Sequence, residues 1–227
     1  MASKVQSRIT ARRRSRGERA GLDIPRIIEA ARSLDPEAVS MKAVADILGV
    51  DRSALNHHVS GRDALLEFVA ADAFSAHAAT IEIPPTDGWQ AACRSFAVGF
   101  TDALVATGRY VEFFRPSVGL VPGLLSPAEA VLRALVRAGV DDEVASRCLG
   151  ALSNICLGFA RDVVLSTNAG EHPRARQVRI AVAAHDERFE NVSRIASGAY
   201  DLCDRKQLEF TVDVFIGGLE DRLFRST

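Results

Sequence analysis

Residues 40–66 (SMKAVADILGVDRSALNHHVSGRDALL) constrain the fold most, because two short helical patterns here are joined by a single tight turn. Ser40 is expected to cap the first helix, since its hydroxyl can accept an unpaired backbone N–H of the opening turn. Gly49 suits the left-handed position after a helix end, and Asp51 is expected to cap the second helix. The apolar face of the first helix consists of Val44, Ile47 and Leu48. This pattern predicts a helix-turn-helix, whose second helix fits a DNA major groove.

The second helix is expected to turn Leu55 inward and to expose short polar side chains. These outward side chains are Arg52, Ser53, Asn56 and His57. An ordinary pair of packed helices shares the same hydrophobic pattern, so the pattern alone does not decide the function. The exposed face favours DNA reading, because its groups form hydrogen bonds with base edges and are not the Glu and Lys of a merely solvated face.

Around these residues the chain resembles the tetracycline-repressor (TetR) family of bacterial transcription regulators. DIPRIIEAARSL resembles the family's amphipathic first helix. ADILGVDRSALNHHVSGRDALL resembles the family's motif, in which a recognition helix ending in Tyr-x-His-Phe/Val precedes a basic residue and Ala-Leu-Leu. Weaker similarity returns in HDERFENV and LEFTVDVFIGGLEDRL, the latter like the last helix of the branch that contains the tetracycline repressor itself. The resemblance implies an all-α fold, with a three-helix DNA-binding module before a larger helical domain.

The resemblance also implies roles for single residues. His58 matches the family's His and Arg62 its basic residue, so both are expected to contact phosphates. Asn56 stands where the family usually carries a Tyr, which leaves open whether it contacts a phosphate or an adenine edge. Lys42 falls where the family can place a base or backbone contact. The expected DNA-contact set in this module is Ser40, Lys42, Arg52, Ser53, Asn56, His57, His58 and Arg62.

The charge of the chain is concentrated at one end. The net charge is −1, yet residues 1–20 contain seven basic residues and one acidic residue. We therefore expect a disordered basic arm over residues 1–21, the helix-turn-helix domain over 22–67 and a helical effector-binding and dimerisation domain over 68–227. Two roles remain open for the arm: minor-groove contact or nonspecific attraction to phosphates. Its candidate contacts are Arg12, Arg13, Arg14 and Arg16.

Helical periodicity continues through the rest of the chain, and no alternating strand pattern is long enough to compete. Helices are expected near residues 62–80, 89–106, 110–114, 126–138, 142–166, 185–197 and 205–224. The polar, Gly- and Pro-containing residues 167–178 are expected to form a loop.

The helices expected near residues 142–166 and 205–224 carry apolar stripes with nearby glycines, a pattern typical of close helix pairing. The expected homodimer contacts are Val144, Cys148, Ala151, Ile155, Leu208, Val212, Phe215 and Leu219. The alternative is that both stripes pack within one chain. A helix-turn-helix regulator needs two copies to span successive half-sites, which favours the dimer.

A small apolar effector is expected in the larger domain, because small-molecule sites are mostly apolar with a few placed polar groups. The candidates are Arg94, Phe96, Phe100, Thr101, Phe113, Phe114, Asn154, Phe159 and Arg161. The alternative is that most of the phenylalanines are core, which would leave an effector-independent regulator whose larger domain only dimerises or binds a protein.

Other function classes find little support. Cys93, Cys148, Cys156 and Cys203 show no metal-ligand spacing and are expected to be core thiols of a cytoplasmic protein. No convergent acid, base and nucleophile set is visible, so we expect no enzyme, no cofactor and no bound metal. Every apolar run is interrupted well short of the ~20 residues of a membrane span, which predicts no membrane partner. The sequence thus predicts a DNA-binding regulator, more readily a repressor than an activator, that a small molecule releases from a palindromic operator.

Overall fold

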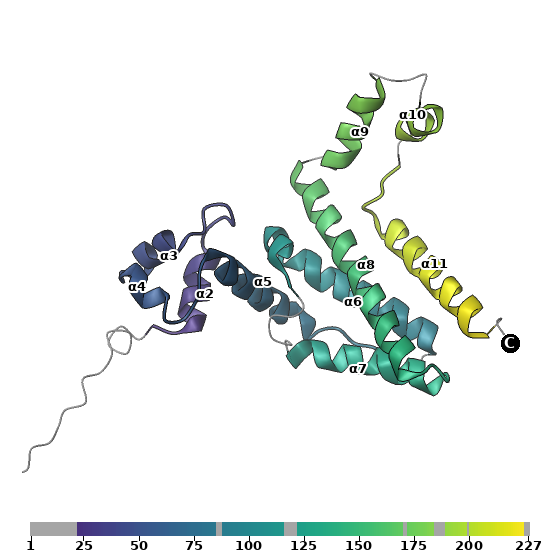
Figure 1. Cartoon of the computed structure of the whole chain (residues 1–227), viewed down its shortest axis with the longest axis horizontal. Helices are drawn as coiled ribbons and strands as arrows, with labels where there is room; N and C mark the ends of the chain where they lie inside the picture. Colours follow the sequence, from purple (N-terminus) through teal and green to yellow (C-terminus); the bar gives the residue numbers. More distant parts are fainter. Residues whose placement is uncertain are drawn as a thin grey trace, which may run out of the picture. The chain divides into compact units, whose positions relative to one another are not determined.

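The computed structural model describes residues 22–84, 88–115, 122–169, 172–183, 189–198 and 200–224, and all regular structure within these ranges is helical (Figure 1). The chain divides into two compact units, Met1–Val69 and Ala70–Thr227. The expected domain boundary after residue 67 and this division both fall within one helix, α5 (Arg62–Ala78). The arginines expected to form a basic arm, Arg12, Arg13, Arg14 and Arg16, lie outside the described residues.

The first unit contains α2 (Ile24–Arg32), α3 (Met41–Leu48), α4 (Arg52–Leu55) and the start of α5. The N-cap of α2 is Asp23, whose carboxylate accepts the Arg26 N–H at 3.0 Å. A small core forms where the apolar sides of these helices meet. Its buried side chains include Ile27, Ala31, Val44, Leu55, Val59, Leu65 and Leu66. Burial of the Ile, Val and Leu side chains in this set contributes about 1.5–3 kcal/mol each to stability.

The second unit is built from α6 (Trp89–Ala106), the 3₁₀ helix η1 (Gly108–Phe113), α7 (Pro122–Arg137), α8 (Asp142–Ala169), α9 (Pro173–Ala183), α10 (Glu190–Ala196) and α11 (Arg205–Phe224), together with the end of α5. Helix α8 packs on α6 and α7, and α11 lies against α6 and α8 (Figure 1). Helices α9 and α10 pack on each other beyond the end of α8.

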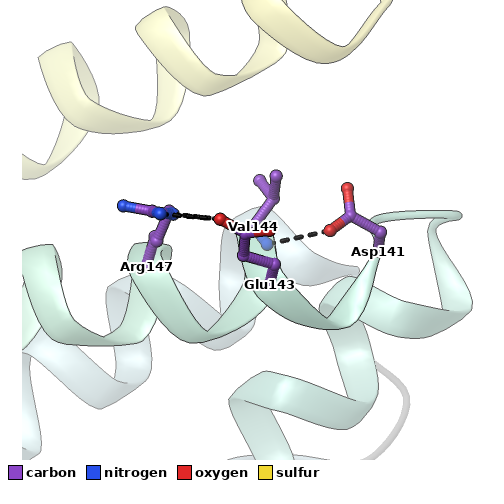
Figure 2. Close-up of polar contacts among 4 residues, drawn as sticks. All are labelled: Asp141, Glu143, Val144 and Arg147. Atoms are coloured by element: carbon purple, nitrogen blue, oxygen red, sulfur yellow. Dashed lines mark hydrogen bonds and ion pairs between the residues drawn. The ribbon is translucent and has the colours of Figure 1, made fainter.

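The start of α8 shows why the sequence places a helix end there. Asp141 accepts the Val144 N–H at 3.0 Å and so caps the helix. One turn later, Arg147 donates to Glu143 across an exposed i,i+4 pair (Figure 2). Negative charge in the first turn also suits the positive end of the helix dipole.

Three polar contacts tie α11 to α6 and show that the two helices run antiparallel. Gln90 pairs with Glu220 at 2.9 Å, Arg94 with Asp213 at 2.9 Å, and Asp102 with Arg205 at 3.0 Å. Rising numbers on α6 therefore match falling numbers on α11. These contacts set the register, while buried apolar residues between the helices supply most of the packing energy.

The structure corrects the expected loop over residues 167–178. Helix α8 continues to Ala169, and α9 begins at Pro173. A proline inside a polar segment favours a loop, but in the first turn of a helix its missing N–H costs nothing. His172 precedes it and lies 3.1 Å from Asp162 of α8, measured between Nε2 and Oδ1. Helix α7 also starts earlier than expected, with Pro127 inside it.

Residues Asp142–Thr167 of α8 are long and apolar enough to cross a membrane, judged by length and composition alone. The core helix of a globular domain passes the same test. Here Leu152, Cys156 and Ala160 are buried within the helical bundle of the second unit.

Candidate nucleic-acid interface

The turn between α3 and α4 has the geometry that its residues predict. Ser40 accepts the Ala43 N–H at 3.1 Å and caps α3, as expected. Gly49 is left-handed at φ 65°, and the Val50 N–H reaches back to the Ala45 carbonyl at 3.1 Å. A residue with a side chain would be strained at this φ, so glycine permits the tight turn.

Two expectations within this segment are wrong. The Asp51 side chain makes no capping hydrogen bond to α4. The helix begins instead with the Asp51 carbonyl, which accepts the Ala54 N–H at 2.9 Å. Ile47 is 50% exposed and so does not belong to the inward face of α3. Helix α4 itself is short and ends at Leu55, with Asn56 as its C-cap.

Most of the expected DNA-contact residues are exposed. Leu55 and Val59 are buried on the inner side of α4 and of the turn that follows it. The exposed candidates are Lys42 on α3, Arg52, Ser53, Asn56 and His57 around α4, and Arg62 at the start of α5. Ser40 and His58 are partly buried, and one lone pair of the Ser40 hydroxyl is occupied by the helix cap.

Arg62, which is expected to contact a phosphate, is exposed and also has hydrogen-bond partners inside its own unit. Its Nε donates to the Val39 carbonyl at 2.8 Å, and its Nη2 donates to the Pro36 carbonyl at 2.9 Å. No motif in the sequence announces these bonds, because they join residues more than twenty positions apart.

Comparison with solved protein structures identifies the fold of this chain. The chain is similar to a possible TetR family transcriptional regulator from Streptomyces coelicolor A3(2), with a TM-score of 0.68 at 20% identity over 87% of this chain and 98% of that one. The chain has the TetR fold. No family model matches the sequence, and no curated protein matches it.

Two further structures with the TetR fold were solved with small molecules. ActR from Streptomyces coelicolor, in complex with actinorhodin, has a TM-score of 0.66 at 22% identity over 91% of this chain and 99% of that one. A TetR variant from Acinetobacter baumannii AYE, in complex with minocycline, has a TM-score of 0.57 at 20% identity over 89% and 98%. At such identities the likeness establishes the fold.

The aromatic candidates for an effector site lie in the core of the second unit. Phe96 stacks on Phe100 with ring centroids 5.1 Å apart, and Phe74 meets Phe100 edge-on at 5.5 Å. Phe74 also lies 4.7 Å from Phe114. Sequence reasoning missed Phe74, because the pattern of α5 gave no sign that its second half joins this group. Phe113 and Phe159 are partly buried against the same core.

The polar candidates separate into three kinds. Arg94 is exposed and paired with Asp213, and Asn154 is exposed on α8. Arg161 donates to the carbonyls at the end of η1, with 3.4 Å to Phe114. Thr101 alone of the four is buried, and its Oγ1 has no hydrogen bond of good geometry among the described residues. Of this group, only the Thr101 hydroxyl lies inside the core, where it interacts with the thiol of Cys156.

Half of the residues expected at the dimer contact are buried within the single chain. Cys148, Leu208, Val212 and Leu219 lie in the core of the second unit. Val144, Ile155 and Phe215 are partly buried, and Ala151 is exposed.

The outward sides of α8 and α11 present a different stripe. On α11, Phe210 is 64% exposed and Val214 is 59% exposed, followed at helical spacing by exposed Gly217 and Gly218. On α8, Gly150 and Gly158 are exposed beside Ala151. A Cβ added at any of the four glycines would meet nothing within 4 Å. Their absent side chains therefore have no packing reason within a single chain, although glycine in a helix costs about 1 kcal/mol relative to alanine.

Burial is the main cause of the raised pKa of each cysteine thiol. Burial raises the pKa of Cys93 to about 12 and that of Cys156 to about 11. Burial also raises the pKa of Cys148 and of Cys203. Among the described residues, no group of three or more His, Cys, Asp or Glu side chains is placed to hold a metal ion.

Proposed function

We propose that this protein is a sequence-specific DNA-binding transcriptional regulator that acts in the cytoplasm. The observation that carries the proposal is the exposed polar face of α4 and its following turn on a helix-turn-helix with the TetR fold. Arg52, Ser53, Asn56 and His57 would reach base edges, while Lys42 and His58 would reach phosphates. The relatives with this fold are regulators, which supports a role in binding and not in catalysis.

The protein acts as a homodimer in this proposal. The outward stripe of α8 and α11 supports it, because Phe210 and Val214 leave apolar surface in water while four glycines leave room for a close helix. Two facing copies would form a four-helix interface. Each dimer would then read two half-sites of a pseudo-palindromic operator.

Release of the operator by a small apolar effector is the finer part of the proposal. The complexes of two relatives with actinorhodin and minocycline support it, as does a buried hydroxyl at Thr101 that a ligand could satisfy. The effector acts only through its different affinities for the DNA-bound and free conformations. The alternative is an effector-independent regulator, which the close ring contacts among Phe74, Phe96 and Phe100 favour, because they describe a filled core.

The deciding experiment is selection of bound sequences from a random DNA pool with the full-length protein. An inverted repeat is expected, and its recovery should be lost in a combined Arg52→Ala and Asn56→Ala variant but kept in Arg133→Ala. Arg133 is a suitable control, because it pairs with Glu129 on the surface of α7. Enrichment that follows only length and salt concentration would mean that the protein is a nonspecific binder.

The same selection tests the basic arm. In the full-length chain with Arg12, Arg13, Arg14 and Arg16 changed to alanine, a minor-groove role predicts that A·T-rich flanks disappear from the selected repeat. A nonspecific role predicts unchanged flanks and a weaker salt dependence.

A second experiment tests the effector. Fluorescence anisotropy of a labelled operator would be followed while minocycline and actinorhodin are titrated separately. Release by either compound, weakened in Thr101→Val, would support effector control through the core. Retention of the operator with both would favour the effector-independent alternative for these two chemical classes.

A further inference from the structure

The side chain of Arg62 connects the start of α5 to the turn between α2 and α3. Arg62 is the first residue of α5, and the two carbonyls that it binds, Pro36 and Val39, lie in the turn between α2 and α3. Val39 directly precedes Ser40, the N-cap of α3. The guanidinium therefore acts at the point where the chain enters the helix-turn-helix.

Part of the turn that Arg62 binds is held by its own backbone bonds. The Asp35 carbonyl accepts the N–H groups of Ala38 and Val39 at 2.8 and 3.1 Å, which makes one helical turn that is not continued. Carbonyls at the end of such a turn lack the partners that a longer helix would supply. Arg62 supplies them through two donors of a rigid planar fork, a geometry that a lysine ammonium does not reproduce.

Both ends of this contact are anchored by buried residues. Pro36 and Val39 are buried on the side of the turn, and Leu65 and Leu66 are buried on the first turns of α5. A change in the length or direction of the Arg62 contact is therefore transmitted to the start of α3, because packed segments do not deform smoothly. The exposed residues around α4 follow α3 after the single turn at Gly49.

We propose that Arg62 is a positioning residue that orients α3 and α4 for DNA reading through its bonds to Pro36 and Val39. This role rests on the proposed function, since it concerns the same DNA-contacting face. It differs from a phosphate contact in its chemistry. A phosphate contact needs a positive charge, which lysine keeps, whereas the bridge needs two donors in one plane, which lysine loses.

The experiment compares Arg62→Lys and Arg62→Gln in the full-length protein, with Arg133→Lys as the control, since Arg133 pairs with Glu129 on the surface of α7. Affinity for the selected operator and for scrambled DNA is measured over a range of salt concentrations. For a positioning residue, Arg62→Lys should lose about tenfold in operator affinity, with no change in affinity for scrambled DNA and no change in the salt slope. If Arg62 contacts a phosphate, Arg62→Lys should keep its affinity and Arg62→Gln should lower the salt slope by about 0.9, which would overturn the proposal.

Amide hydrogen exchange without DNA provides a second and independent readout. Exchange at Ala38, Val39 and Ala43 should become faster in Arg62→Lys and stay unchanged in Arg133→Lys, because these three amides bond within the bridged turn and the cap of α3. Unchanged exchange in Arg62→Lys would overturn the proposal even if operator binding is observed. If the wild-type protein binds no operator while exchange accelerates as expected, the DNA-binding function fails and the structural bridge stands.

Discussion

Arg94 on α6 donates to Asp213 on α11 at 2.9 Å, and both side chains are at least half exposed. The pair fixes the register of two antiparallel helices, and it removes Arg94 from the groups that could orient an effector inside the core. Because water screens an exposed pair, the double-mutant cycle Arg94→Ala with Asp213→Ala should give a coupling of only about 0.2–1 kcal/mol. Chemical denaturation of the four variants measures it. A coupling well above this range would mean that the pair is shielded from solvent in the assembled protein.

Ser40 is expected to contribute to stability through the cap of α3. Ser40→Ala should lower the free energy of unfolding by about 1 kcal/mol, since the Ala43 N–H loses its acceptor. Ser40→Asp keeps an acceptor and should restore most of the loss. Thermal denaturation compares the three proteins. If Ser40→Ala is as stable as the wild type, the cap contributes nothing and Ser40 has another role.

Val214 tests the proposed dimer face. Val214→Glu should shift the protein toward the monomer in sedimentation equilibrium. The substitution replaces an apolar side chain that is 59% exposed in the single chain with a charged one, which the dimer interface would bury. Val136→Glu on α7 is the matched control, since Val136 is 47% exposed outside the stripe and should leave the association state unchanged. Equal behaviour of the two variants would place the interface elsewhere.

Gly217 offers a second view of the same face. In a single chain, Gly217→Ala should raise helix stability by up to about 1 kcal/mol, because a Cβ there meets nothing within 4 Å. In the proposed dimer the methyl group blocks close approach of the partner helix, so the association constant should fall. Sedimentation and denaturation at low protein concentration separate the two effects. Stronger association would contradict a close helix contact at Gly217.

The four cysteines should differ in their reaction with a disulfide reagent at pH 8. Cys93 and Cys156 are buried, with pKa values raised by burial to about 12 and 11, so few of their thiols are ionised and none is accessible. Cys203 is the least buried and should react first; its fast phase should vanish in Cys203→Ser. In the unfolded chain all four thiols ionise near their ordinary pKa of 9.0, so stability should fall as the pH rises from 9 toward 12. A second fast thiol would show that the core opens readily.

The helix caps and turn residues of this protein could be predicted from its sequence, because they depend on local chemistry. Ser40, Gly49, Asp23 and Asp141 act on backbone groups within a few residues of themselves, so their roles as caps or turn residues follow from position alone. The same holds for α6 and α11, whose apolar periods are complete enough to mark both ends. Pro173 shows the limit of such rules, because a proline ends one helix and begins another with equal ease.

The tertiary structure alone decided which side of each helix is buried and which distant groups meet. The stripes of α8 and α11 are periodic on more than one side, and only packing against α6 shows that Cys148, Leu208 and Val212 face inward while Phe210 and Val214 face water. Arg62 is basic and lies where a phosphate contact is expected, yet its partners are carbonyls more than twenty residues earlier in the chain. Hydrophobic periodicity determines that a helix has an inner face; the contacts of the folded chain determine which residues of other segments meet that face and which polar groups find partners there.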